Sequence, residues 1–170
     1  MNYALVNYPK INSTNIDEYR KRYDPEVEVV NPHITLMAGI PTNEVNEESL
    51  IAHLGAVIRK QNSFSITLRG VSTSSDGLLI YLNVEEGKDQ LRQIHEDIYT
   101  GMLSGYIFPH LPFNPHVTLG LFSKTNDNSE RALKEAVDAN FYFKYTADSF
   151  HLIVGDGLKP ISLVEELLIK

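Results

Sequence analysis

The stretch PHITL at residues 32–36 recurs as PHVTL at residues 115–119. The chain holds only eight Pro and six His, so a second Pro-His-x-Thr-Leu arises by chance with odds on the order of one in a thousand. The order of predicted elements around each copy is also similar, namely helix, His-Thr strand, helix and hairpin. We therefore interpret the chain as two related halves that each contain one His-x-Thr strand.

The first copy begins the apolar run HITLMAGI at 33–40, which is typical of a strand. Side chains alternate between the two faces of a strand. His33, Thr35 and Met37 are therefore expected on one face. Ala38 is expected on the opposite, apolar face together with Ile34, Leu36 and Ile40.

The second copy begins the run HVTLGLF at 116–122. By the same alternation, His116, Thr118 and Phe122 are expected on one face of this strand. If a pseudo-two-fold axis relates the two halves, the polar faces meet and form one site with two His and two Thr.

The remaining pattern predicts the α+β class. Helices are expected from about 12 to 25, 46 to 58, 87 to 103 with Met102 facing inward, and through 132 to 137. Further strands are expected at 3–8, in a hairpin from 64 to 84, at 142–154 and at 161–169, the last two joined across a turn at 155–157. No linker or low-complexity tract divides the chain, so we predict a single domain over 1–170 with two lobes.

The balance of 22 acidic against 15 basic residues gives a net charge of −7, which argues against long nucleic acids and anionic membranes as partners. The absence of Cys excludes disulfides, thiolate metal sites and Cys nucleophiles, and favours a reducing compartment. The first ten residues, MNYALVNYPK, match neither a signal peptide nor a membrane anchor. We expect a cytoplasmic protein.

Two imidazoles and two hydroxyls suit the hydrolysis of a phosphodiester. One imidazole takes a proton from the attacking water while the other gives a proton to the leaving oxygen. Each Thr hydroxyl can donate to a non-bridging phosphate oxygen. Such a site needs no metal ion, no cofactor and no covalent intermediate. A single His-x-Thr would favour a structural hydrogen-bonded pair instead, and the repetition is what favours a site.

The paired His-x-Thr strands resemble those of the 2H phosphoesterase superfamily, which includes the 2′-5′ RNA ligase-like proteins and cyclic nucleotide phosphodiesterases. The segments YRKRYDP at 19–25, IYTG at 98–101 and FHL at 150–152 resemble a bacterial subgroup of it. The resemblance implies a bilobal, pseudo-two-fold fold with two antiparallel sheets around a central cleft and helices outside. It also implies hydrolysis of 2′,3′-cyclic or related nucleotide phosphodiesters, with His33 and His116 as acid and base and Thr35 and Thr118 on the phosphate.

A small nucleotide or a short RNA end is the expected partner. Tyr23 and Phe122 are candidates for stacking on its base, although core packing is the commoner role of such rings. The basic run Arg20, Lys21 and Arg22 forms either a solvated helix face or the positive rim of the cleft.

Other functions remain open from sequence. The rivals are a catalytically weak protein that binds nucleotides or RNA ends, and RNA 2′-5′ ligase-like activity. Some relatives carry a basic residue soon after the second motif, where Gly120, Leu121 and Phe122 stand here, and this difference argues against ligation. The remaining histidines, at 53, 95, 110 and 151, are expected to be structural, and the sequence does not indicate an oligomeric state.

Overall fold

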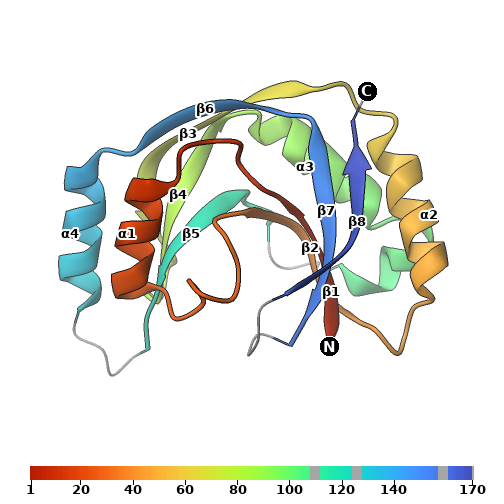
Figure 1. The fold of residues 1–170 in the computed structure, drawn as a ribbon, viewed down its shortest axis with the longest axis horizontal. Coiled ribbons are helices and arrows are strands. Elements are labelled where there is room, and N and C mark those ends of the chain that lie inside the picture. Colours follow the sequence, from red (N-terminus) through yellow and green to blue (C-terminus); the bar gives the residue numbers. More distant parts are fainter. Residues whose placement is uncertain (108–111, 124–127, 157–160, 170) are drawn as a thin grey trace.

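The two His-Thr strands lie side by side at the middle of one curled antiparallel sheet, as Figure 1 shows. The computed structural model describes residues 1–107, 112–123, 128–156 and 161–169. In this part of the chain the sheet has the strand order β6-β3-β4-β5-β2-β1-β7-β8. The strands are β1 (Asn2–Asn7), β2 (Ile34–Pro41), β3 (Phe64–Thr73), β4 (Leu79–Glu86), β5 (His116–Leu121), β6 (Tyr142–Ala147), β7 (Ser149–Gly155) and β8 (Ser162–Leu168).

The sheet consists of two halves that meet where β2 pairs with β5. Among the described residues these strands pair only at Ile34 and Val117, whereas the neighbouring strands pair over several residues. The α+β class and the antiparallel strands around a central cleft are as expected from the sequence. The two expected sheets are, however, connected at this one residue pair.

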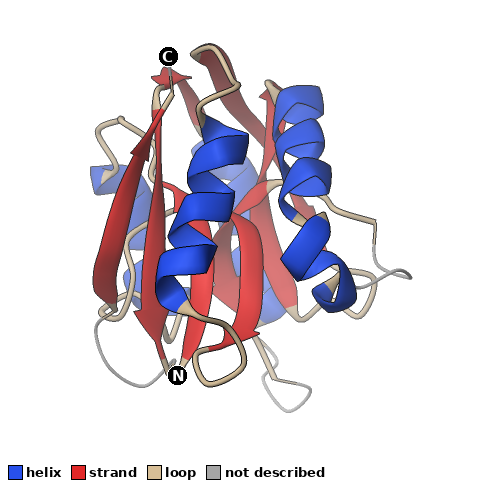
Figure 2. Cartoon of the chain, turned by 90° about the vertical axis from the view of Figure 1, so that its right-hand side faces the viewer, coloured by secondary structure: helices blue, strands red, loops and turns tan. Residues whose placement is uncertain are grey.

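In the described ranges four helices cover the outer side of the curled sheet. They are α1 (Thr14–Tyr23), α2 (Glu47–Ile58), α3 (Lys88–Ile98) and α4 (Ser129–Ala139), and a 3₁₀ helix spans Gly101–Tyr106. Helices α1 and α4 lie against the half with β3 and β5, whereas α2 and α3 lie against the half with β2 and β8 (Figure 1). Figure 2 shows the side of the molecule that lies on the right in Figure 1, with helices packed over the strands. Each half of the sheet therefore combines strands from distant parts of the sequence and carries one His-Thr motif.

The predicted side-chain alternation fails in the second part of β2. The register of β1 against β2 shifts between the pairs Leu5–Met37 and Val6–Thr35. Such an irregularity inserts a residue and reverses the faces beyond it. Met37 is consequently buried in the core and Ala38 is exposed, the opposite of the prediction.

Two other element predictions need correction, the end of the third helix and the strand over 142–154. The third helix ends at Ile98, before Gly101 with its φ of +54° begins the 3₁₀ helix, so Met102 is exposed and Leu103 is buried instead. Helix α4 buries Ala132 and Ala136, whereas Val137 is exposed.

The single strand predicted over 142–154 is interrupted at Asp148. Its two parts, β6 and β7, pair with β3 and β1, which lie in opposite halves of the sheet. The chain therefore crosses from one half to the other at this residue. The predicted turn at 155–157 includes Gly157, which lies outside the described residues, as does His110.

Candidate active site

The two motif histidines are held by the same backbone contact. Nδ1 of His33 lies 2.8 Å from the Asn31 carbonyl oxygen, and Nδ1 of His116 lies 2.7 Å from that of Asn114. A carbonyl oxygen only accepts hydrogen bonds, so Nδ1 must be the protonated nitrogen of each ring. Nε2 of the neutral ring is then left with a free lone pair, as a general base requires.

The two asparagines were missed in the sequence, although the repeat extends to them. Asn31-Pro32-His33 and Asn114-Pro115-His116 are identical triplets directly before the strands. Proline restricts the residue before it to extended conformations, so the same triplet repeats the same carbonyl position. Starting the repeat one residue earlier would have predicted these contacts.

The four motif residues border two adjoining cavities. His33, Thr35 and Thr118 border a cavity of about 290 Å³, and His116 and Thr35 border one of about 470 Å³. Thr35 and Leu79 belong to both cavities, which therefore form one cleft. The structure thus brings together the four residues that the repeat predicted.

Burial lowers the pKa of both histidines from the ordinary value of 6.5. The hydrogen bond to the backbone carbonyl opposes this effect in each case. The nearby charge of Arg20 lowers the pKa of His33 further, whereas Asp24 raises it. At neutral pH both rings are therefore neutral in the free protein.

The lowered pKa values predict how stability depends on pH. We expect the free energy of unfolding to fall as the pH decreases below about 6.5, because His33 and His116 take up protons in the unfolded chain while they resist protonation in the folded one. Above that pH their contribution is complete. Urea unfolding at pH 7.5 and pH 5.5 measures the loss, which should be smaller in His33→Ala and in His116→Ala. If the wild-type protein and both variants lost the same free energy of unfolding between these two pH values, the lowered pKa values of His33 and His116 would be contradicted.

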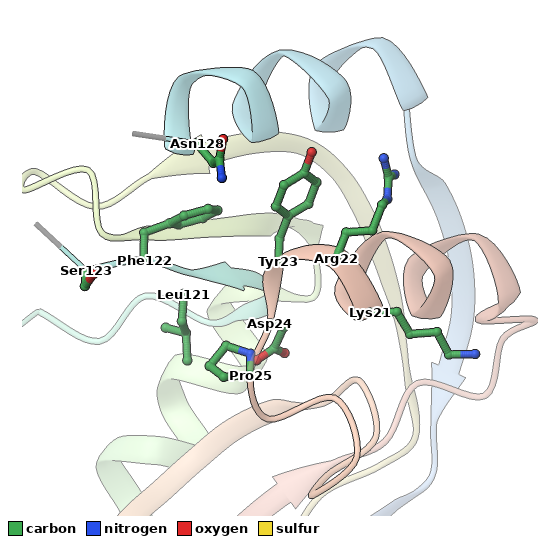
Figure 3. Close-up of a pocket in the computed structure, with 9 residues that line it drawn as sticks. All are labelled: Lys21, Arg22, Tyr23, Asp24, Pro25, Leu121, Phe122, Ser123 and Asn128. Carbon is green, nitrogen blue, oxygen red and sulfur yellow. The ribbon is translucent and has the colours of Figure 1, made fainter. Parts of the chain in front are cut away.

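Tyr23 and Phe122 line a cavity that adjoins the His33 end of this cleft. With Lys21 and Arg22 they border about 550 Å³, shown in Figure 3, and this cavity shares Asp24 and Leu121 with the cavity of His33. The centres of their rings are 6.1 Å apart, and the Tyr23 hydroxyl donates to Glu135 at 2.8 Å. None of the four motif residues is among the described lining residues of this cavity, so Tyr23 and Phe122 adjoin the cleft of the motifs without lining it.

Arg20 does not belong to a solvated helix face. Its side chain is 2% exposed and its Nε donates to Asp24 at 2.8 Å, whereas Lys21 and Arg22 are exposed. Nη2 donates to the Val30 carbonyl at 2.9 Å, and Nη1 has no partner among the described residues. Arg20 also borders the cavity of His33, so a buried cation lies next to the motifs. In the sequence, the (i, i+4) spacing of Arg20 and Asp24 is the feature that could have predicted this ion pair.

The other described histidines differ in position. His53 contacts the carbonyl of Ile98 at 2.8 Å, and His151 lies 3.6 Å from Glu166. His95 was expected to be structural, and its Nδ1 does donate to the Leu36 carbonyl at 2.7 Å, but its ring also borders the larger cavity of the cleft.

Within the described ranges, no cluster of three or more residues suited to hold a metal ion is present, and no helix is long and apolar enough to cross a membrane.

Comparison with known proteins agrees with this geometry. The family model described as the 2′-5′ RNA ligase superfamily matches residues 8–159. A Bacillus cytotoxicus protein named "Putative phosphoesterase" is 31% identical over 157 residues, which cover 90% of this chain and 88% of that protein. The chain therefore belongs to the 2′-5′ RNA ligase superfamily, and its predicted kinship with the 2H phosphoesterases is confirmed.

Solved structures show the same fold. Thermus thermophilus TT0787 aligns with a TM-score of 0.69 at 17% identity, covering 99% of this chain and 97% of that chain. E. coli LigT in complex with 3′-AMP aligns with a TM-score of 0.62 at 16% identity, again covering 99% of this chain and 97% of that chain.

Proposed function

We propose that this phosphoesterase hydrolyses 2′,3′-cyclic or related small nucleotide phosphodiesters by acid and base catalysis from its two motif histidines. The observation that supports this most is the repeated tether of Nδ1 to a backbone carbonyl. It leaves Nε2 of both rings available at one cleft that also contains both threonines. The complex of E. coli LigT, a protein of the same fold, with 3′-AMP supports a nucleotide as ligand.

The proposed reaction needs two proton transfers. A water oxygen attacks phosphorus, and the bond between phosphorus and one ester oxygen breaks. The neutral imidazole takes a proton from the water, while the other imidazole, charged in the complex, donates a proton to the leaving oxygen. Because the pKa of both rings is lowered, the ring that acts as the base is already neutral at pH 7 and can take up a proton. The acid gains its proton when the anionic phosphate binds, because an adjacent negative charge favours the imidazolium.

Thr35 and Thr118 complete the proposed site. Both residues border the cavity of His33, and Thr35 also borders that of His116. This supports a role in which their hydroxyls donate hydrogen bonds to the non-bridging oxygens of a phosphate between the two rings, where negative charge increases in the transition state.

Turnover in the presence of a chelator tests this proposal. We expect the purified protein to hydrolyse nucleoside 2′,3′-cyclic phosphates, or 2′-5′ dinucleotides, at a rate that excess EDTA changes less than about twofold, because both proton transfers come from side chains. Product formation is followed by chromatography. Loss of turnover on chelation and its return with a divalent ion would overturn the mechanism. Absence of turnover on all these substrates would favour the rival, a protein that only binds nucleotides.

A further inference from the structure

The two ends of the cleft differ in chemistry. At the His33 end the cavity is bordered by the charged side chains of Arg20, Asp24 and Glu26. At the His116 end the larger cavity has no Lys, Arg, Asp or Glu among its described lining residues. Most of its lining is aromatic or aliphatic, including Leu36, Met37, Tyr81, His95, Tyr99 and Phe113, and its polar lining residues, among them Thr35, Ser74 and Asn114, are uncharged. The phosphate site therefore has one polar side and one apolar side.

The aromatic side is held in place by hydrogen bonds and stacking. The rings of His95 and Phe113 are parallel within 3° with centres 3.9 Å apart, and Nδ1 of His95 donates to the Leu36 carbonyl. The Tyr99 hydroxyl accepts a hydrogen bond from the backbone N–H of Ala38 at 3.4 Å. The ring centres of Tyr99 and His95 are 4.9 Å apart, and the two rings meet edge to face. These rings are thus fixed without a ligand, and they form the wall of a pocket of a size typical of small-molecule sites.

Tyr81 connects this pocket to the motif. Its ring centre lies 4.7 Å from that of His116, and both residues border the pocket. A flat, uncharged ring system that enters the pocket is therefore adjacent to whatever His116 contacts. A nucleobase is such a ring system, and it is joined to the phosphate through a ribose.

We propose that this pocket, beside His116, receives the nucleobase of the substrate and so determines that His116 is the general acid and His33 the general base. The proposal rests on the proposed function. With the base in the aromatic pocket, the ribose and its ester oxygens lie on the side of His116. The attacking water then approaches from the polar side, near His33.

The proton balance follows from this orientation. His33 Nε2 takes one proton from the water as its oxygen bonds to phosphorus. The bond between phosphorus and one ribose oxygen breaks, and His116 gives its Nε2 proton to that oxygen. The charge on the two rings is exchanged, and proton release from His33 together with proton uptake by His116 restores the free enzyme.

Closing the pocket tests the base site. Ala38 is exposed and borders the pocket, so Ala38→Trp should fill it, and Ala38→Leu should fill it in part. For adenosine 2′,3′-cyclic phosphate we expect kcat/KM to fall at least about tenfold in Ala38→Trp and less in Ala38→Leu. For glycerol 1,2-cyclic phosphate, which has no base, kcat/KM should change less than about twofold, because the phosphate site is intact. Val137→Trp, on the exposed side of α4, is the matched control and should change neither value.

The outcomes separate this proposal from the proposed function. Equal losses on both substrates, or a wild-type enzyme that uses both equally well, would overturn the base site. If the wild-type protein hydrolyses neither, the proposed function fails, and calorimetry with adenosine 3′-monophosphate decides on the base site alone. Binding that is at least about tenfold weaker in Ala38→Trp supports it, and equal binding overturns it.

A sulfur leaving group tests the roles of the histidines. A thiolate leaves without a proton, so a variant that lacks the general acid recovers on a nucleoside cyclic phosphate in which the leaving ribose oxygen is sulfur. We expect His116→Ala to lose at least about 100-fold on the oxygen substrate but less than about tenfold on the 2′-thio or the 3′-thio isomer. His33→Ala should lose the same factor on all three. Recovery of His33→Ala, or of neither variant, would overturn the assignment.

Discussion

Replacement of His33 or His116 by alanine is expected to lower kcat at least about 100-fold, the usual contribution of a general acid or base. The double variant should be little slower than either single one, because acid and base act in the same step and their losses do not add. Thr35→Ala and Thr118→Ala should each cost less, since each removes one hydrogen bond to the phosphate. Steady-state kinetics on a nucleoside 2′,3′-cyclic phosphate measures all of these.

The matched control for these variants is His53→Ala. His53 is a half-buried histidine whose ring nitrogen also contacts a backbone carbonyl, that of Ile98, but it lies on α2 away from the cleft. Turnover should be unchanged there. Circular dichroism should show that His33→Ala and His116→Ala remain folded, because both side chains border an open cleft. A folded His33→Ala protein with full turnover would refute the two-histidine site.

The sequence predicts that these four residues meet at one cleft because the information is local and is present twice. His33 and Thr35 are two residues apart on one strand, and so are His116 and Thr118, which strand alternation places on one face each. The repeat then relates the two faces. The structure places these residues around one cleft, and the tether of both rings to the preceding Asn carbonyl adds the proton position that a motif alone does not contain.

The errors arise where distant segments determine the local structure. The faces of Met37 and Ala38 depend on the register shift between β1 and β2, which no property of the β2 sequence indicates. The stacking of His95 on Phe113 joins α3 to the segment before β5. The sequence consequently predicts the four motif residues of the proposed phosphate site but not the aromatic pocket next to them, since the motifs are repeated and the pocket residues are not.

Arg20 shows the same limit in the helix before the first motif. In sequence it is one of three consecutive basic residues. In the structure the segment that follows α1 returns over it, so that its guanidinium holds the Asp24 carboxylate and the Val30 carbonyl. Val30 lies directly before the Asn31 that tethers His33. The buried ion pair thus supports the segment that positions one of the two motif histidines.

Arg20→Met is therefore expected to destabilise the protein by about 3–5 kcal/mol, because it leaves the Asp24 carboxylate buried without its partner. The double variant with Asp24→Leu should recover much of this loss, since no isolated charge remains. Arg22→Met is the matched control, because its ion pair with Glu135 is partly exposed and should cost less than about 1 kcal/mol. Urea unfolding at pH 7.5 measures all three variants. A loss no larger in Arg20→Met than in Arg22→Met would mean that water reaches Asp24, and that the segment before His33 does not depend on this ion pair.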